Sequence, residues 1–95
     1  MKKVNFDHNA VRKIWYSRGF SCDIWIDPPG KVWANFVHGT DELLMLIDGE
    51  IELEMDDKIL HPEIGDEILI PAGMNHTVRN IGLVTNHWFY GYKDN

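Results

Sequence analysis

The amino-acid sequence predicts an all-β sandwich or barrel, on two observations. From residue 20 onward, apolar and polar side chains alternate with a period of two, which is the pattern of strands that bury one face. Pro and Gly residues interrupt this alternation at short, regular intervals and divide it into about seven short strands. No helical pattern separates these strands, so a parallel sheet is disfavoured.

A short helix is expected before the strands, over residues 7–18. Asp7 and Asn9 are both candidate caps, Trp15 belongs to the apolar side of the segment, and Gly19 ends it. We expect residues 1–19 to form an amino-terminal arm and residues 20–95 a single barrel, both in one domain. A chain of 95 residues, of which 44% are hydrophobic, is large enough for one core.

Turn signals set the expected boundaries of the strands. The first four expected strands cover residues 20–27, 31–38, 42–47 and 50–55. Asp48-Gly49 is a strong signal for a β-hairpin, and residues 56–58 form a second turn. In the fourth strand Ile51, Leu53 and Met55 alternate with glutamates, which predicts that these three side chains share one buried face.

Composition and charge exclude several classes of function. With 15 acidic and 9 basic residues the formal net charge is −6, which argues against nucleic acid as a partner. The longest apolar run, residues 43–47, is far too short to span a membrane. Cys22 is the only cysteine, so no intrachain disulfide forms. Because no secretory signal pattern opens the sequence, we expect a cytoplasmic protein.

A carboxylate and a histidine are the first candidate metal ligands. His38 and Glu42 are four residues apart, an even spacing that points both side chains to the same side of a strand, although turn-like residues 39–41 lie between them. Glu42 begins an alternation that continues through Leu44 and Leu46, which places its carboxylate in line with an inward, apolar face. A carboxylate in that position is costly unless a cation binds it.

A second histidine completes the candidate set. His76 follows the tight turn of residues 71–73 and is in phase with the apolar Val78. Two imidazoles and one carboxylate that face a dry barrel interior are a common ligand set for a divalent metal. Another histidine, His87, lies in a segment that can face inward or outward, and we keep it as a candidate acid–base group of a pocket.

The sequence around these residues resembles the cupin family. Residues 65–80 follow the second cupin motif at every position, through Gly65, Pro71, Gly73, His76 and Asn80. The spacing of the first cupin motif is matched by Gly30, His38, Glu42 and Gly49, whereas Phe36 stands where the motif has the first histidine of a pair. The two motifs span residues 30–80, which is more than half of the chain.

The resemblance implies a double-stranded β-helix, or jelly roll, in which each motif forms a hairpin. It also implies a divalent metal held by His38, Glu42 and His76, for which zinc, iron, manganese and nickel are all compatible. Two interpretations of Phe36 stay open, because its ring either shapes an apolar pocket beside a three-ligand metal or fills a degenerate site without metal. The expected pocket lining for a small-molecule ligand is Phe36, Leu44, Leu46 and Val78.

Aromatic and apolar residues allow two interpretations. Five aromatic side chains are numerous for so small a barrel: Trp25, Trp33, Trp88, Tyr90 and Tyr92. We expect them in the core and at a subunit interface, and the alternative is a pocket lining that stacks a ring-bearing ligand. The resemblance also implies a homodimer, in which a second copy would cover the outward side chains of Leu43, Met45 and Ile47.

Three functions agree with these expectations. The first is a metal-dependent enzyme that binds a small organic molecule by an oxygen atom and supports oxygenation, isomerisation or decarboxylation. The second is a non-catalytic module that holds a metal or a small ligand for sensing. The third is a metal-free structural or interaction protein. The cupin scaffold carries many chemistries, so the resemblance does not choose between them.

Overall fold

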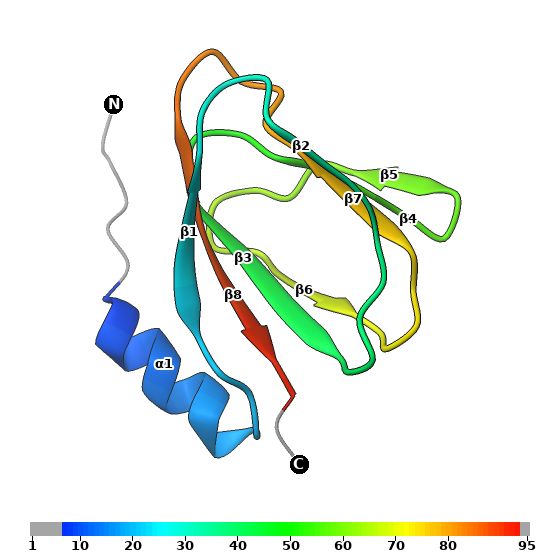
Figure 1. Ribbon diagram of the computed structural model, residues 1–95. Coiled ribbons are helices and arrows are strands. Elements are labelled where there is room, and N and C mark those ends of the chain that lie inside the picture. Colours follow the sequence, from blue (N-terminus) through cyan, green and yellow to red (C-terminus); the bar gives the residue numbers. More distant parts are fainter. Residues whose placement is uncertain (1–6, 94–95) are drawn as a thin grey trace.

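One helix precedes eight strands in the computed structural model, which describes residues 7–93 (Figure 1). The elements are, in chain order, α1 (His8–Ser17), β1 (Asp23–Asp27), β2 (Val32–Phe36), β3 (Glu42–Asp48), β4 (Glu52–Met55), β5 (Lys58–Leu60), β6 (Glu67–Ile70), β7 (His76–Arg79) and β8 (Asn86–Tyr92). The predicted all-β class with a short amino-terminal helix is confirmed.

The strands form two antiparallel sheets of four strands each, in the orders β1-β8-β3-β6 and β2-β7-β4-β5. The chain crosses repeatedly from one sheet to the other, so the sheets face each other as the two halves of a jelly roll. Figure 1 shows β2 and β7 above β3 and β6. The double-stranded β-helix that the cupin motifs imply is therefore confirmed.

Two expectations about hairpins are wrong. β3 pairs with β6 and β8, whereas β4 pairs with β5 and β7, so Asp48-Gly49 leads from one sheet into the other. Likewise, β2 and β3 of the first motif lie in different sheets, as do β6 and β7 of the second. A tight turn sets only the local direction of the chain, and burial between two sheets decides the partner strand. The other predicted turn, at residues 56–58, does join a hairpin of β4 and β5.

Apolar side chains from both sheets fill a core between them. The buried members are Leu44, Leu46, Ile51, Leu53, Ile70, Val78 and Trp88. Ile51 and Leu53 are buried and Met55 packs against this core, as the alternation in the sequence predicted. The removal of this apolar surface from water is the main force that holds the two sheets together.

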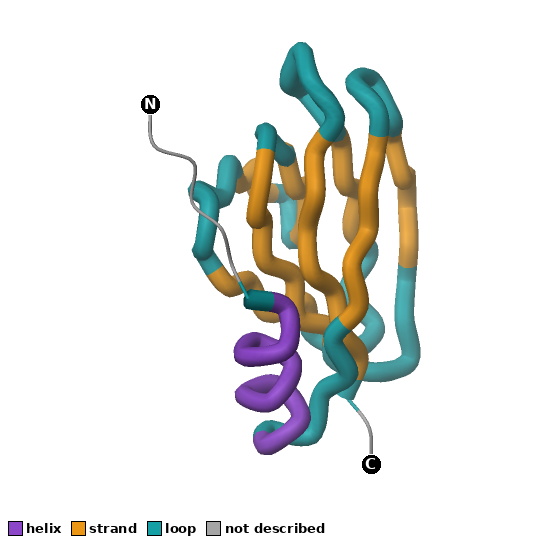
Figure 2. Tube along the Cα trace, turned by 90° about the vertical axis from the view of Figure 1, so that its left-hand side faces the viewer, coloured by secondary structure: helices purple, strands orange, loops and turns teal. Residues whose placement is uncertain are grey.

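Helix α1 covers the outer face of the sheet that contains β3 and β8. Its Trp15 is 1% exposed and belongs to a second core cluster with Leu43 and Phe89, and Figure 2 shows the helix lying against the strands. Met45 and Ile47 pack against the same cluster. The cover that was expected from a second copy is therefore supplied by the chain's own helix.

The ends of α1 follow from local chemistry. Asp7 accepts a hydrogen bond from the backbone N–H of Asn9 at 2.9 Å, so Asp7 is the cap of the two candidates. After the helix the chain passes close to β8 at Gly91, where a Cβ atom would collide with the carbonyl of Ser21. Within residues 7–93, no helix combines the length and the apolar character needed to cross a bilayer.

Candidate metal centre and ligand pocket

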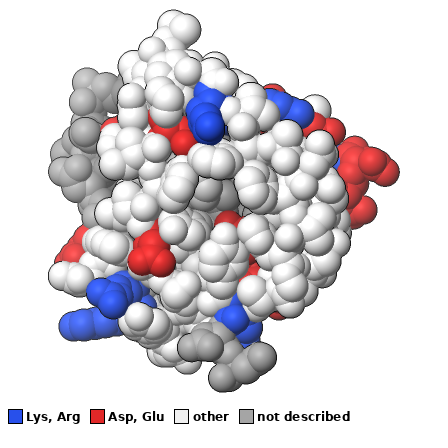
Figure 3. Space-filling model, viewed as in Figure 1, with Lys and Arg blue, Asp and Glu red and all other residues white. Residues whose placement is uncertain are grey.

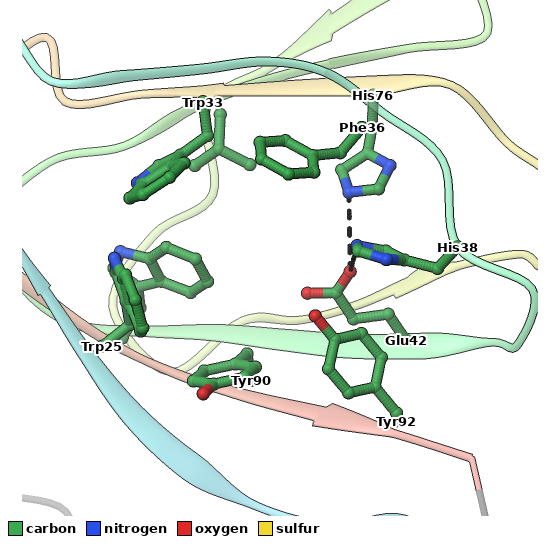
Figure 4. A pocket seen from close by; sticks show the side chains of 10 residues that line it. Trp25, Trp33, Phe36, His38, Glu42, His76, Tyr90 and Tyr92 are labelled. Carbon is green, nitrogen blue, oxygen red and sulfur yellow. Dashed lines mark ion pairs between the residues drawn. The ribbon is translucent and has the colours of Figure 1, made fainter.

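The three predicted metal ligands meet at one end of the barrel interior. His38 lies in the loop after β2, Glu42 is the first residue of β3, and His76 is the first residue of β7. One ligand atom from each side chain lies within 4.8 Å of the others, and Figure 4 shows the three side chains pointing toward one another. The two cupin motifs, far apart in the sequence, thus supply one cluster.

Backbone contacts between the two motif loops hold this cluster in place. The N–H of Gly73 donates to the carbonyl of His38 at 2.8 Å. The N–H of Ala72 donates to the Asp41 carboxylate at 2.8 Å, and the N–H of Lys93 donates to the Asp41 carbonyl at 2.8 Å. The loop that carries His38 and the turn that precedes His76 therefore stay together without help from a bound ion.

The distances within the cluster fit a metal ion. Oε1 of Glu42 lies 3.2 Å from Nε2 of His38 and 3.5 Å from Nε2 of His76. Two atoms that each lie about 2.1 Å from a tetrahedral metal are about 3.4 Å apart. The same oxygen is buried and makes no hydrogen bond within the described part of the chain, which is costly unless a cation satisfies it.

His76 is oriented by a contact on its far side. Its Nδ1 lies 3.0 Å from the carbonyl oxygen of Met74, and because a carbonyl only accepts, Nδ1 is the atom that carries the hydrogen. The Nε2 lone pair then faces Glu42, as in metal-binding histidines. Burial lowers the pKa of His76, but Glu42 and the Met74 carbonyl raise it, and the net pKa is above the ordinary value. The Glu42 carboxylate thus favours a positive charge at Nε2 of His76, whether a proton or a metal ion supplies it.

Phe36 stands beside the cluster where the first cupin motif has a histidine. It pairs with His76 across β2 and β7, and its ring centroid lies 6.4 Å from that of His76 and 6.0 Å from that of His38. The register shifts between Trp33 and Phe36, at a bulge that contains Asn35 with a φ of 57°. Because of this bulge, both aromatic rings face the interior although they are three residues apart.

A cavity of about 250 Å³ opens beside the three candidate ligands. Its walls are Trp25, Trp33, Phe36, His38, Glu42, His76, Val78, Trp88, Tyr90 and Tyr92. In Figure 3, the middle of the face shown is formed mostly by residues other than Lys, Arg, Asp and Glu. A small site with apolar walls and a few polar groups at one end is the usual form of a ligand pocket.

Of the predicted pocket residues, Phe36 and Val78 are among the walls of this cavity, together with all five aromatic residues singled out in the sequence. Leu44 and Leu46 also face inward, but they are 0% and 2% exposed and lie in the core between the sheets. His87 is not a wall residue, and its Nδ1 lies 3.5 Å from Asp48. The alternation in β8 explains this, because Trp88 and Tyr90 take the inward positions.

Asp27 is a residue of this site that the sequence did not reveal. It is 3% exposed and accepts hydrogen bonds from Nε1 of Trp25 at 2.9 Å and from Nε1 of Trp33 at 3.0 Å. The carboxylate therefore fixes two rings of the cavity wall from behind. Its spacing of two from Trp25 places both on one face of a strand, but nothing in the sequence connects it with Trp33.

The two tyrosines of the wall are weak acids. Burial raises the pKa of Tyr92 to about 12, and the Glu42 carboxylate adds to this effect. Burial and nearby carboxylates also raise the pKa of Tyr90. Both hydroxyls therefore stay protonated near neutral pH, where they can donate hydrogen bonds to a ligand.

The architecture defines a class of protein, a jelly-roll barrel with a candidate metal centre and a small cavity in its interior. The cupin domain family matches residues 23–90, and the chain belongs to this family. A search of curated proteins found no match.

Several solved structures share the fold. The plu4264 protein from Photorhabdus luminescens has a TM-score of 0.72 and 25% identity, over 80% of this chain and 63% of that one. A cupin 2 conserved barrel domain protein from Salinispora arenicola has a TM-score of 0.71 and 22% identity, over 80% and 64% of the two chains. The cupin domain of an XRE family transcriptional regulator from Enterobacter cloacae has a TM-score of 0.73 and 20% identity, over 85% and 88%.

This chain spans less than two thirds of the Photorhabdus and Salinispora chains. The similarity extends over the barrel, and it is a similarity of fold. Because cupin barrels carry many activities, the site itself has to supply the argument for function.

Proposed function

We propose that this cupin binds one divalent metal ion through His38, Glu42 and His76 and holds a small organic ligand in the adjoining cavity. The buried Oε1 of Glu42 carries the proposal, because it faces Nε2 of both imidazoles without a hydrogen bond. Such a group of polar atoms in a dry interior is unfavourable unless a positive charge balances the carboxylate. A metal ion between the three groups supplies it at any pH at which it binds, whereas a proton on His76 supplies it only below the pKa of that imidazole.

The metal ion and the cavity walls have different roles in the proposed site. Three protein ligands leave at least one coordination position for a ligand atom or water. A metal held there supplies a Lewis acid for an oxygen atom of the ligand. The chain's own residues exclude water through the aromatic walls, and Phe36 occupies the place of a fourth protein ligand. Nitrogen and oxygen donors of this kind suit zinc, iron, manganese and nickel.

Two uses of the site are candidates, and one observation favours each. The open coordination position beside a cavity favours a metal-dependent oxygenase, isomerase or decarboxylase. The lack of a wall residue with a pKa near neutral pH, outside the candidate metal ligands and among the described residues, favours a non-catalytic sensing module. Besides the candidate metal ligands, only Tyr90 and Tyr92 titrate among the described wall residues, and their pKa values are raised. A general acid or base works best when its pKa is near the working pH.

A homodimer is part of the proposal. Strand β1 is at the edge of its sheet, and its Ile24 and Ile26 are 42% and 55% exposed. Exposed apolar side chains on an edge strand favour pairing with a second copy. Light scattering coupled to size-exclusion chromatography tests this, since a monomer at micromolar concentration would contradict it.

The unpaired Cys22 agrees with a reducing compartment such as the cytoplasm.

Elemental analysis of the purified, untagged protein tests the metal site. We expect close to one metal ion per chain in the wild type after supply of zinc, iron, manganese and nickel, and its loss in His76→Ala. The matched control is His61→Ala, because His61 is exposed and lies against Glu52, outside the cluster.

Circular dichroism of both variants checks that the barrel is intact. A wild type that takes up none of the four metals, or equal metal in His76→Ala, would refute the metal site. It would favour the metal-free interaction protein, with Phe36 filling a degenerate site.

A further inference from the structure

Three aromatic rings enclose the end of the cavity that lies away from the candidate metal ligands. Trp25 and Trp33 have ring centroids 5.5 Å apart at an interplanar angle of 73°, and Trp25 and Tyr90 have centroids 5.8 Å apart at 84°. Figure 4 shows Trp33 and Tyr90 on opposite sides of the space and Trp25 at its end, with the candidate ligands at the other end. The rings therefore form three steeply inclined walls.

A buried carboxylate stands behind two of these walls. Asp27 accepts the indole N–H groups of Trp25 and Trp33 and is 3% exposed, and it has no salt-bridge partner among residues 7–93. Donation to an anion shifts electron density toward the rings, so their faces become more negative. A neutral amide oxygen can accept the same N–H groups, although more weakly, whereas a carboxylate also adds a negative charge behind the rings.

Two carboxylates lie in or directly behind the cavity walls, those of Glu42 and Asp27. The described walls of the cavity contain the Glu42 carboxylate and neither Lys nor Arg. Near one of these rings the chain already places a cation, because Nζ of Lys31 lies 4.2 Å from the Trp33 ring centroid. A divalent metal ion at the cluster would outweigh the single charge of Glu42 and leave a net charge of +1 there, but it would leave Asp27 and the three rings unchanged at the far end.

We propose that this aromatic end binds the quaternary ammonium group of a small organic ligand. An ammonium in contact with ring faces is attracted by their negative potential, and its methyl groups fill apolar space. The volume of about 250 Å³ equals that of about eight water molecules at ~30 Å³ each, which suits a trimethylammonium group with a short tail. This inference deepens the proposed function and rests on the cavity being a ligand site, and it does not need the metal.

Choline and its neutral isostere 3,3-dimethyl-1-butanol are the probes that isolate the charge, because the two molecules have nearly the same shape. Calorimetric titration at constant ionic strength measures both, with metal-free and with metal-loaded protein. We expect choline to bind about tenfold more tightly than the isostere in the metal-free form, and by a smaller factor that stays above one in the metal-loaded form, where the cluster carries a net positive charge. Equal affinities, or no measurable binding of choline, would overturn the inference.

Two substitutions test the residues that carry the inference. Asp27→Asn keeps a hydrogen-bond acceptor and removes the charge, and Trp25→Leu removes one wall. Either substitution should bring the ratio of the affinity for choline to that for the neutral isostere close to one. Glu67→Gln is the matched control, because Glu67 also accepts an indole N–H, from Trp15 at 3.0 Å, but on the outer face. A preference that survives both cavity substitutions would contradict the inference.

The outcomes separate this inference from the proposed metal site. A preference for choline in a protein that takes up no metal would sustain the inference and refute the metal site. Stoichiometric metal with no preference for choline would do the reverse.

Discussion

The two faces of the sheet β1-β8-β3-β6 use the same residue types in opposite ways. On the outer face, Trp15 is 1% exposed and donates its N–H to Glu67, whose side chain is 31% exposed and pairs with Arg18 at 2.8 Å. On the inner face, Trp25 is 36% exposed and donates to Asp27, which is 3% exposed. The outer tryptophan is therefore packing, whereas the inner one is a wall of a cavity with its acid buried behind it.

This difference shows how aromatic residues of the core can be distinguished from those of a binding site in a small barrel. Aromatic residues on the outer face fill their space completely under α1, where Phe89 is fully buried and meets Trp15 edge-on with centroids 6.4 Å apart. The inner face leaves a hollow lined by aromatic rings and by the buried Glu42. Buried carboxylates reduce stability unless something binds them, so their concentration on the inner face favours a binding role.

The largest expected change is a loss of stability when a buried side chain of the outer face is truncated. Phe89→Ala removes a fully buried ring from the cluster under α1 and should lower the free energy of unfolding by about 3–5 kcal/mol. Urea denaturation followed by circular dichroism measures this. Metal content per folded chain should stay at the wild-type value, and its loss in a variant that is still folded would break the distinction between the two faces.

The second-largest expected change is a loss of metal affinity when a ligand on the inner face is substituted. Glu42→Gln removes the carboxylate that faces both imidazoles and should weaken metal binding by about a hundredfold, a loss of about 2.7 kcal/mol. The metal-free protein should lose stability at low pH, where His76 is protonated, because the substitution removes the charge that raises the pKa of this imidazole. Competition with a chromophoric chelator measures the affinity, and a change of less than threefold would remove Glu42 from the ligand set.

The reactivity of Cys22 tests how well water is excluded from the core cluster under α1, to which this residue belongs. Burial raises the pKa of its thiol to about 11 from an ordinary value of 9.0, so at pH 8 about a hundredfold less thiolate is present than for a free cysteine. Labelling with a thiol reagent should therefore be at least a hundredfold slower in the native protein than in urea. The native rate should rise as the pH approaches 11, and rapid labelling at pH 8 would show that the cluster opens.

The smallest effect sharpens the interpretation of Phe36. Phe36→His places an imidazole where the cupin motif has one, on the strand position that pairs with His76. A fourth ligand should raise the metal affinity by about tenfold, or about 1.4 kcal/mol. The same chelator competition measures this. Unchanged affinity would mean that position 36 does not reach the metal, and the pocket-shaping role of the ring would then stand alone.

The sequence was sufficient for the elements and for the centre of the site. The period-two alternation predicted the strands, and the even spacing of Glu42 from Leu44 predicted that its carboxylate faces inward. The resemblance to the cupin motifs predicted that His38, Glu42 and His76 lie together, and their ligand atoms are within 4.8 Å of one another.

The rest depended on contacts that are distant in the sequence. Asp48-Gly49 carries a hairpin signal, but the choice of partner strand comes from the packing of two sheets. The bulge at Asn35 turns Trp33 inward beside Phe36, against the simple alternation. Asp27 becomes part of the site only because β1 and β2, in different sheets, bring Trp25 and Trp33 to the same carboxylate.

The central claim is that a metal ion lies between the two imidazoles and the carboxylate, and X-ray absorption spectroscopy of zinc-loaded protein tests it most directly. The account predicts two imidazole nitrogens and at least one oxygen at about 2.0–2.2 Å from the metal, with a reduced imidazole signal in His76→Ala. A shell of oxygen atoms without imidazole scattering, unchanged by that substitution, would contradict it.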